Sequence, residues 1–359
     1  MDKMDKEKEK SIGKKIKDLI KGNVKMYLCW LFLLGLGMLI ISGIFEARYE
    51  KTVQSKIYQA YDEEENLQQD IDTYEKELEE LEIQYVQDIS AKPCIILCFD
   101  DLGSSVYGDV INEMDKYGFV GVIIFRDGKV PGEKGCISVE LYQELLGKGW
   151  EGAIGNSKEI SVYENFPDTM RQKWVAYMKE MKAGFTKNGL DSPKIYIPHE
   201  KEKIDEIQDL LLEYQMTGYT VLEEDVTRAA VDMNIDDVTV MGCIIAKYNY
   251  DSLSQDVSYL LPKAKSMAVL FKKVEPGAPG NKKNTSLYML KKHLARLDIL
   301  SGYVNICTFT GYRQYQDELV NQNLEVYQNY LNKRNQIQNK IISANKAIML
   351  SLIHISEPT

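Results

Sequence analysis

The stretch IILCFDDLGSS, residues 95–105, runs an apolar segment directly into two adjacent acids, Asp100 and Asp101. A short apolar run that ends at a Gly-Ser turn is typical of a buried strand. Adjacent carboxylates repel each other, and burying either one without compensation is costly. Such a pair at the end of a strand holds a metal ion, shares a proton or faces solvent in a loop. Which of these applies decides what the protein does.

The rest of the chain places this strand in a larger pattern. Seven more strand-like runs follow, at 119–125, 150–154, 194–198, 217–222, 238–246, 267–274 and 303–308, and amphipathic stretches lie at 106–117, 139–148, 169–187 and 203–214. Strands that alternate with helices form a parallel sheet, and eight of them predict a barrel. Chemistry in such barrels lies at the carboxyl ends of the strands, which is where Asp100 and Asp101 stand.

Three longer segments carry a resemblance to a known family. IILCFDDLGSSVYGDVINEMDKYGFVGVIIF at 95–125 resembles the opening of the polysaccharide deacetylase domain (NodB-homology domain, carbohydrate esterase family four), whose first strand ends in Thr-Phe-Asp-Asp-Gly. ISVELYQELLGKGWEGAIGN at 137–156 is similar to the segment before the second motif, and IYIPHEKEKIDEIQDLLLEYQMTGYTVLEED at 195–225 to the Pro-containing third motif. The resemblance implies a distorted (β/α) barrel of the polysaccharide deacetylase type over 91–312.

The resemblance also implies a chemistry. Family members remove N-acetyl or O-acetyl groups from glycans with a divalent metal, usually zinc, which lowers the pKa of a bound water and polarises the acetyl carbonyl. One acid of the Asp-Asp pair acts as base, and the other binds the metal with two histidines spaced His-x-x-x-His. Carried over to this sequence, Asp100 matches the base and Asp101 the metal ligand.

Most of the remaining apparatus is absent from this sequence. The two histidine positions fall on Gly155 and Glu159, and no histidine occurs before residue 199. The position of the arginine that orients the base holds Tyr196, and that of the late histidine, which acts as acid, holds Phe271. We therefore expect no metal and no cofactor, and we expect Asp100 to be the remnant of a catalytic base.

Two sets of residues remain candidates for binding. If a metal binds at all, oxygen-rich ligation by Asp101, Glu159 and His199 would suit zinc or a harder ion. Substrate contacts are predicted for Tyr196, Pro198 and Tyr107, because sugar-binding clefts use aromatic faces. The loop EPGAPGNKKNTS at 275–286 either borders the mouth of the barrel or is an ordinary connection, and His293, in LKKHLARL, is expected on the surface.

The N-terminal part predicts a membrane protein. Residues 1–25 carry nine lysines and five acids and are expected to be a basic cytoplasmic tail. MYLCWLFLLGLGMLIISGIF at 26–45 has no formal charge and is long enough for one hydrocarbon core. Lysines before it and acids after it predict a single-pass anchor in the cell membrane, with a cytoplasmic N-terminus and an extracellular C-terminal domain.

Two segments with apolar residues at three-four spacing flank the predicted barrel. The first, at 46–90, predicts a coiled-coil stalk, and the second, at 313–349, repeats the spacing with more polar residues. Either the first segment forms a parallel homodimer or the two segments pair within one chain. LSLIHISEPT at 350–359 resembles a translated sequencing-adapter sequence.

The net charge of −10 argues against a nucleic-acid partner. The six cysteines form no CxxC pair, and buried free thiols are expected. The leading hypothesis is a deacetylase-like protein without catalysis that binds or scaffolds a cell-envelope or exported polysaccharide. One alternative is an active glycan N- or O-deacetylase with a rearranged acidic metal site, and another is a coiled-coil interaction protein of the cell surface.

Overall fold

The structure is a computed structural model that describes residues 3–100, 107–156, 160, 168–201, 207–229, 232–235, 237–247 and 249–356. The chain divides into two units. One comprises Met1–Leu78 with Asn335–Thr359, and the other is Glu79–Arg334. The second unit contains all the strands, and it positions the candidate site.

Seven parallel strands of this unit close into a barrel. They are β1 (Cys94–Asp100), β2 (Val122–Phe125), β3 (Glu151–Ile154), β4 (Ile195–Tyr196), β5 (Gly218–Glu223), β7 (Val238–Ile245) and β8 (Met267–Phe271). Each strand pairs with the next in this order, and β8 pairs back onto β1. The predicted (β/α) barrel is therefore confirmed.

The eighth predicted strand does not take part in closing the barrel. It is β11 (Asn305–Cys307), which pairs only with the first three residues of β1. Three short strands were not predicted: β6 (Asp232–Ile235) runs antiparallel to β7, and β9 (Val274–Glu275) pairs with β10 (Thr285–Ser286). The predicted run at 267–274 thus contains β8 and only the first residue of β9.

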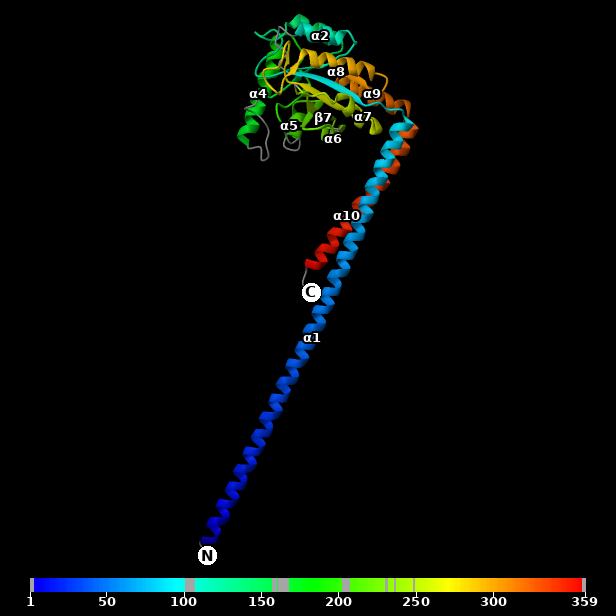
Figure 1. Ribbon diagram of the computed structural model, residues 1–359. Helices are drawn as coiled ribbons and strands as arrows, with labels where there is room; N and C mark the ends of the chain where they lie inside the picture. The colour runs from blue at the N-terminus through cyan, green and yellow to red at the C-terminus, as the bar shows by residue number, and fades with distance from the viewer. Residues whose placement is uncertain are drawn as a thin grey trace. The chain divides into compact units, whose positions relative to one another are not determined.

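Helices surround the barrel (Figure 1). They are α2 (Tyr107–Asp115), α3 (Val139–Gly147), α4 (Asp168–Lys187), α5 (Gln208–Glu213), α6 (Val226–Ala229), α7 (Leu253–Leu260), α8 (Leu287–Ile299) and α9 (Phe309–Gln322), with a short 3-10 helix at Leu261–Lys263. Several begin at hydroxyl caps: the side chains of Ser138, Ser286 and Thr308 accept hydrogen bonds from the first turns of α3, α8 and α9.

The alternation of side chains along β1 produces two hydrophobic layers. Cys94, Ile96 and Cys98 belong to the smaller cluster inside the barrel. Their neighbours Ile95, Leu97 and Phe99 belong to the larger cluster between the strands and the helices. Cys94, Cys98, Cys136, Cys243 and Cys307 are free, and the first two and Cys243 are buried, which confirms the prediction of buried thiols for these three.

Two long helices, α1 (Lys3–Asp88) and α10 (Leu324–Ser356), extend through both units. Within the barrel-containing unit, the Tyr85 ring of α1 stacks on Tyr330 of α10 with 4.3 Å between ring centroids. Within the other unit, the Lys340 ammonium of α10 lies 4.9 Å from the ring centroid of Tyr74 in α1. These contacts favour pairing within one chain over a parallel homodimer.

The prediction of a location in the cell membrane is wrong. Among the residues that the structure describes, no helix is both long enough and apolar enough to cross a bilayer. The run at 26–45 forms no separate element, because it continues in α1 into charged sequence on both sides, and part of its side chains lies outside the described residues. The prediction of a single-pass protein with an extracellular domain is contradicted by this finding.

Candidate functional site

A buried ion pair lies at the carboxyl ends of the first two strands. Asp100 continues the inward positions of β1, and it is aligned with Ile124 of β2, so that Arg126 follows two residues beyond on the same face. The Arg126 Nε donates to Asp100 Oδ2 at 2.8 Å, and both side chains are 8% exposed. The negative charge of Asp100 is therefore compensated by the guanidinium of Arg126.

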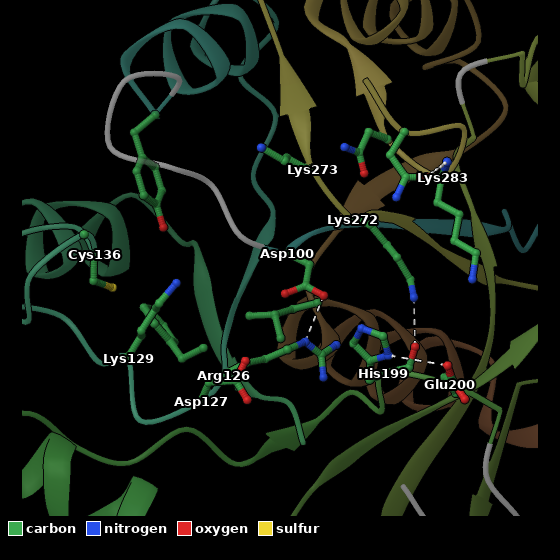
Figure 2. Close-up of a pocket in the computed structure, with 16 residues that line it drawn as sticks. Asp100, Arg126, Asp127, Lys129, Cys136, His199, Glu200, Lys272, Lys273 and Lys283 are labelled. Atoms are coloured by element: carbon green, nitrogen blue, oxygen red, sulfur yellow. Dashed lines mark hydrogen bonds and ion pairs between the residues drawn. The ribbon is translucent and has the colours of Figure 1, made fainter. Parts of the chain in front are cut away.

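The same guanidinium also joins the next two strand ends. Its Nη1 donates to the Asn156 carbonyl at 2.9 Å, just after β3, and its Nη2 donates to the Pro198 carbonyl at 3.3 Å, just after β4. Arg126, which follows β2, thus makes charge-assisted hydrogen bonds with groups from three other strands, β1, β3 and β4. This set of partners fixes the side chain across the mouth of the barrel. Figure 2 shows the contact of Arg126 with Asp100.

Gly155 is the residue over which this guanidinium lies. A Cβ atom built on Gly155 would overlap the guanidinium of Arg126. Any larger side chain at 155 would therefore have to displace Arg126. Since the resemblance aligns Gly155 with a metal-binding histidine, a permanent cation occupies the space that such a histidine would need.

His199 is held beside this pair through its backbone. Its amide N–H donates to Asn156 Oδ1 at 2.7 Å, and its carbonyl accepts a hydrogen bond from Lys272 Nζ at 3.0 Å. Burial, followed by the charges of Lys272 and Arg126, lowers the pKa of His199 below its ordinary value. The imidazole is therefore neutral at pH 7, and its Nδ1 lies 4.0 Å from the Glu200 carboxylate.

These groups border a cavity of about 520 Å³, which is within the range of small-molecule sites. Figure 2 shows Asp100, Arg126 and His199 at its centre, with Lys129 and Cys136 on one side and Lys272, Lys273 and Lys283 on the other. Asn281, Lys283 and Asn284 come from the Gly/Pro loop, so this loop does border the mouth of the barrel.

The predicted substrate-binding residues are found in three different environments. Tyr107 lines the cavity. Pro198 is buried, and it takes part through the carbonyl that accepts from Arg126. Tyr196 is fully buried: its hydroxyl accepts from Trp174 Nε1 at 3.0 Å and its ring stacks on Tyr219. Tyr196 therefore offers no surface to a ligand.

The structure also locates His199 and His293. Of the predicted metal ligands, Asp101 and Glu159 lie outside the described residues, and His199 is half-buried at the cavity. The prediction of a surface position for His293 is wrong, because this side chain is 1% exposed and packs against Tyr250 and Phe271.

The described residues do not fit a divalent metal. The Arg126 guanidinium engages the carboxylate of Asp100 and covers Gly155, so the positions that the resemblance gives to the base and to one metal-binding histidine both face a permanent positive charge. Within the described part of the chain, no three His, Cys, Asp or Glu residues come together as a ligand group. A metal placed between Asp100 and Gly155 would have to displace the guanidinium, and this requires the loss of its hydrogen bonds to Asp100, Asn156 and Pro198.

The sequence did not lead to three residues of the site, which are Arg126, Asn156 and Lys272. Each follows the end of a parallel strand, which is the position that directs side chains to the mouth of a barrel. That signal was available for Arg126, which follows the predicted run at 119–125, but not for Lys272, which lies within the predicted run at 267–274. Nothing in the sequence shows that Arg126 pairs with Asp100.

Comparisons with known proteins give similar folds among solved structures. No family model and no curated protein matches the chain. A protein of Mycobacterium smegmatis assigned to the polysaccharide deacetylases is 10% identical, with a TM-score of 0.40 and 65% of this chain and 92% of that chain covered. The family 4 carbohydrate esterase from Streptomyces lividans is 13% identical, with a TM-score of 0.36 and coverage of 61% and 92%.

A third similar structure is the peptidoglycan deacetylase PdaC from Bacillus subtilis, 11% identical, with a TM-score of 0.35 and coverage of 66% of this chain and 96% of that chain. At this identity no residue role passes from these structures to the present chain.

Proposed function

We propose that the barrel binds a polysaccharide at the carboxyl ends of its strands and does not deacetylate it with a metal. The observation that carries this proposal is the position of Arg126, which neutralises Asp100 and covers Gly155. The Arg126 guanidinium holds one carboxylate oxygen of Asp100 and fills the space above Gly155, where the resemblance places a metal-binding histidine. What remains is a polar, fixed cavity suited to holding a ligand.

Two observations support a polysaccharide as the ligand. The sequence resembles a family that acts on glycans, and the cavity has the size and mixed polar lining of a small-ligand site. Hydrogen-bond donors and acceptors from Lys272, Asn281 and Asn284 are the groups with which proteins bind sugar hydroxyls.

The test uses the full-length chain. Metal content is measured by mass spectrometry, and the metal-free protein is reloaded with zinc, manganese, cobalt or calcium and assayed for acetate release from acetylated chitooligosaccharides. In parallel, retention of polysaccharides is measured by affinity electrophoresis. We expect retention of polymer without stoichiometric metal and without acetate.

A matched pair of variants gives the test its control. Arg126→Gly frees the space above Gly155, whereas Lys173→Gln changes one exposed residue on α4. Stoichiometric metal that is lost in Asp101→Ala, together with acetate release by the unmodified chain, would establish the acidic metal site instead. A chain that retains no polymer at all would leave only the paired helices α1 and α10 as the functional part.

A further inference from the structure

The charge of the cavity is opposite to that of the protein. Among the residues that the structure describes, five basic ones line it (Arg126, Lys129, Lys272, Lys273 and Lys283), against three acidic ones (Asp100, Asp127 and Glu200). The whole chain has a net charge of −10. A local excess of positive charge on an acidic protein is a feature of a site for anions, because such a cleft concentrates ligands of opposite sign.

Two of these lysines face the cavity without a carboxylate partner in the described part of the chain. Lys272 directly follows β8, and its Nζ donates to a backbone carbonyl, that of His199. Burial, and then the positive charge of Lys283, lowers the pKa of Lys272 below its ordinary value. The two ammonium groups therefore repel each other across the cavity, and an anion placed between them would relieve this repulsion.

The loop that carries Lys283 is held in place from both ends. β9 pairs with β10, so that the segment between them is closed into a short loop. Inside the loop, the Glu275 carboxylate accepts hydrogen bonds from the Gly280 amide at 2.7 Å and from Asn284 Nδ2 at 2.9 Å. This bracing places Asn281 and Asn284 beside Lys283 at the cavity, where they add neutral hydrogen-bond donors.

We propose that the cavity binds the acidic group of an anionic polysaccharide, a carboxylate or a phosphate carried by its sugar units, between Lys272 and Lys283. This inference rests on the proposed function, since it specifies which class of polysaccharide the site takes. Arg126 is not part of the anion site, because Asp100 already neutralises it. The neutral donors of the loop and the wall formed by Tyr107 contact the uncharged part of the sugar.

The experiment measures dissociation constants by isothermal titration calorimetry with the full-length chain. The probes are an oligogalacturonate, which carries carboxylates, a phosphorylated mannan oligosaccharide, and a chitooligosaccharide of equal length as the neutral reference. The variants are Lys272→Gln and Lys283→Gln, and Lys173→Gln on the exposed face of α4 is the matched control. Thermal unfolding of each variant verifies that it is folded.

We expect one or both acidic probes to bind at least tenfold more tightly than the neutral one at low salt. Each cavity variant weakens this binding by roughly tenfold, as the loss of one charged hydrogen bond does, and Lys173→Gln leaves it unchanged. The preference falls as salt rises, because exposed charges are screened. The stronger of the two acidic probes identifies carboxylate or phosphate as the recognised group.

Three other results would overturn the inference, and they can be told apart. Equal binding of neutral and acidic probes would refute the anion site but keep the proposed function. Tight binding of an acidic probe that neither cavity variant weakens would place the anion elsewhere on the protein. If no oligosaccharide of any kind binds, the proposed function fails and this inference fails with it.

Discussion

The two ends of the barrel are built from the same strands in opposite ways. At the amino end, Phe309 and Tyr312 of α9 enter the inner cluster and are 2% and 6% exposed. The amides of Phe309 and Thr310, at the start of α9, donate to the Glu151 carboxylate at 3.1 and 3.0 Å, which satisfies a helix terminus that would otherwise lack partners. The carboxyl end has instead a charged cavity with Asp100 and Arg126 at its centre.

A single strand, β1, shows how this difference arises. Its inward positions are Cys94, Ile96, Cys98 and Asp100, so that the polarity changes from apolar to charged at the last step. Burial raises the pKa of Cys98, and it raises the pKa of Cys243 to about 12, so these inner thiols stay protonated and unreactive. The amino end, which α9 closes, thus stabilises the barrel. The carboxyl end, which is open at the cavity, is free to bind a ligand. We call these the closed end and the open end.

The largest effect is expected from opening the closed end. Phe309→Ala removes a ring that packs inside the barrel against Gly218 and should lower the free energy of unfolding by about 4 kcal/mol. If the two ends of the barrel have separate roles, the glycan affinity of the folded variant stays unchanged. Urea unfolding and calorimetry check both parts. Phe309→Leu, which keeps most of the volume, should cost less than about 1.5 kcal/mol.

A loss below about 1 kcal/mol for Phe309→Ala would contradict the closed end as a source of stability, since a ring truncated in a packed core costs several times more. A weakened glycan affinity in the folded variant would show that the two ends are coupled.

At the open end, the corresponding change is Arg126→Met. It leaves the Asp100 carboxylate buried without its counter-ion and should destabilise the protein by about 3 kcal/mol. The double variant Asp100→Leu with Arg126→Met removes both charges and should recover most of that loss. Urea unfolding of the two single variants and the double variant gives the coupling energy between the residues. Equal losses in Arg126→Met and the double variant would mean that the pair is not the source of the effect.

His293, which is buried between the barrel and its helices, should determine how the free energy of unfolding changes at low pH. Burial, followed by the charge of Arg296, lowers the pKa of His293 to about 4, and neither ring nitrogen has a hydrogen-bond partner among the described residues. Because this folded-state pKa lies below the ordinary value of about 6.5, the stability is fully present above pH 6.5 and is lost as the pH falls toward 4.

His293→Leu should therefore reduce the loss of unfolding free energy between pH 7 and pH 4.5 by about 2 kcal/mol. Urea unfolding at several pH values measures it, and His199→Leu is the comparison variant. The pKa of His199 is also lowered, but this residue is half-buried at the cavity, so we expect a smaller change. A larger change for His199→Leu would assign the acid response to the open end.

The sequence predicted the barrel better than its site. All eight apolar runs are strands in the structure, because β-branched and aliphatic runs between amphipathic helices leave few other arrangements. Closure by seven of them was not predictable, since it depends on β8 pairing with β1 and on β11 pairing with only the start of β1. The run at 267–274 was read as one strand, although the chain breaks between Phe271 and Val274.

For the site, the sequence identified Asp100 but not its partner. The placement of Arg126 depends on the register of β2 against β1, which no local pattern encodes. Tyr196 shows the opposite error: an aromatic residue before a proline was expected to face a ligand, yet Trp174 of α4 covers it and accounts for its hydroxyl. Residue type and strand ends predict where a site lies, while tertiary packing decides which side chains reach it.

The smallest effect is expected from the loss of one hydroxyl group at the open end, that of Tyr177. The Tyr177 hydroxyl donates to the Gly155 carbonyl at 2.6 Å and accepts from the Asp127 amide at 3.0 Å, which joins the segments after β2 and β3 below Arg126. Tyr177→Phe should lower the free energy of unfolding by about 1 kcal/mol. Because these segments carry cavity residues, it should also weaken glycan binding about threefold, which is a change of roughly 0.7 kcal/mol in the free energy of binding.

Thr308→Ala is the matched change at the closed end, where it removes the cap that accepts from the Gly311 amide and should also cost about 1 kcal/mol. The two variants are thus expected to be equal in urea unfolding but different in calorimetry, where only Tyr177→Phe changes the dissociation constant. If both variants weaken glycan binding to the same extent, affinity follows the overall stability of the barrel, and the division of roles between its ends does not hold.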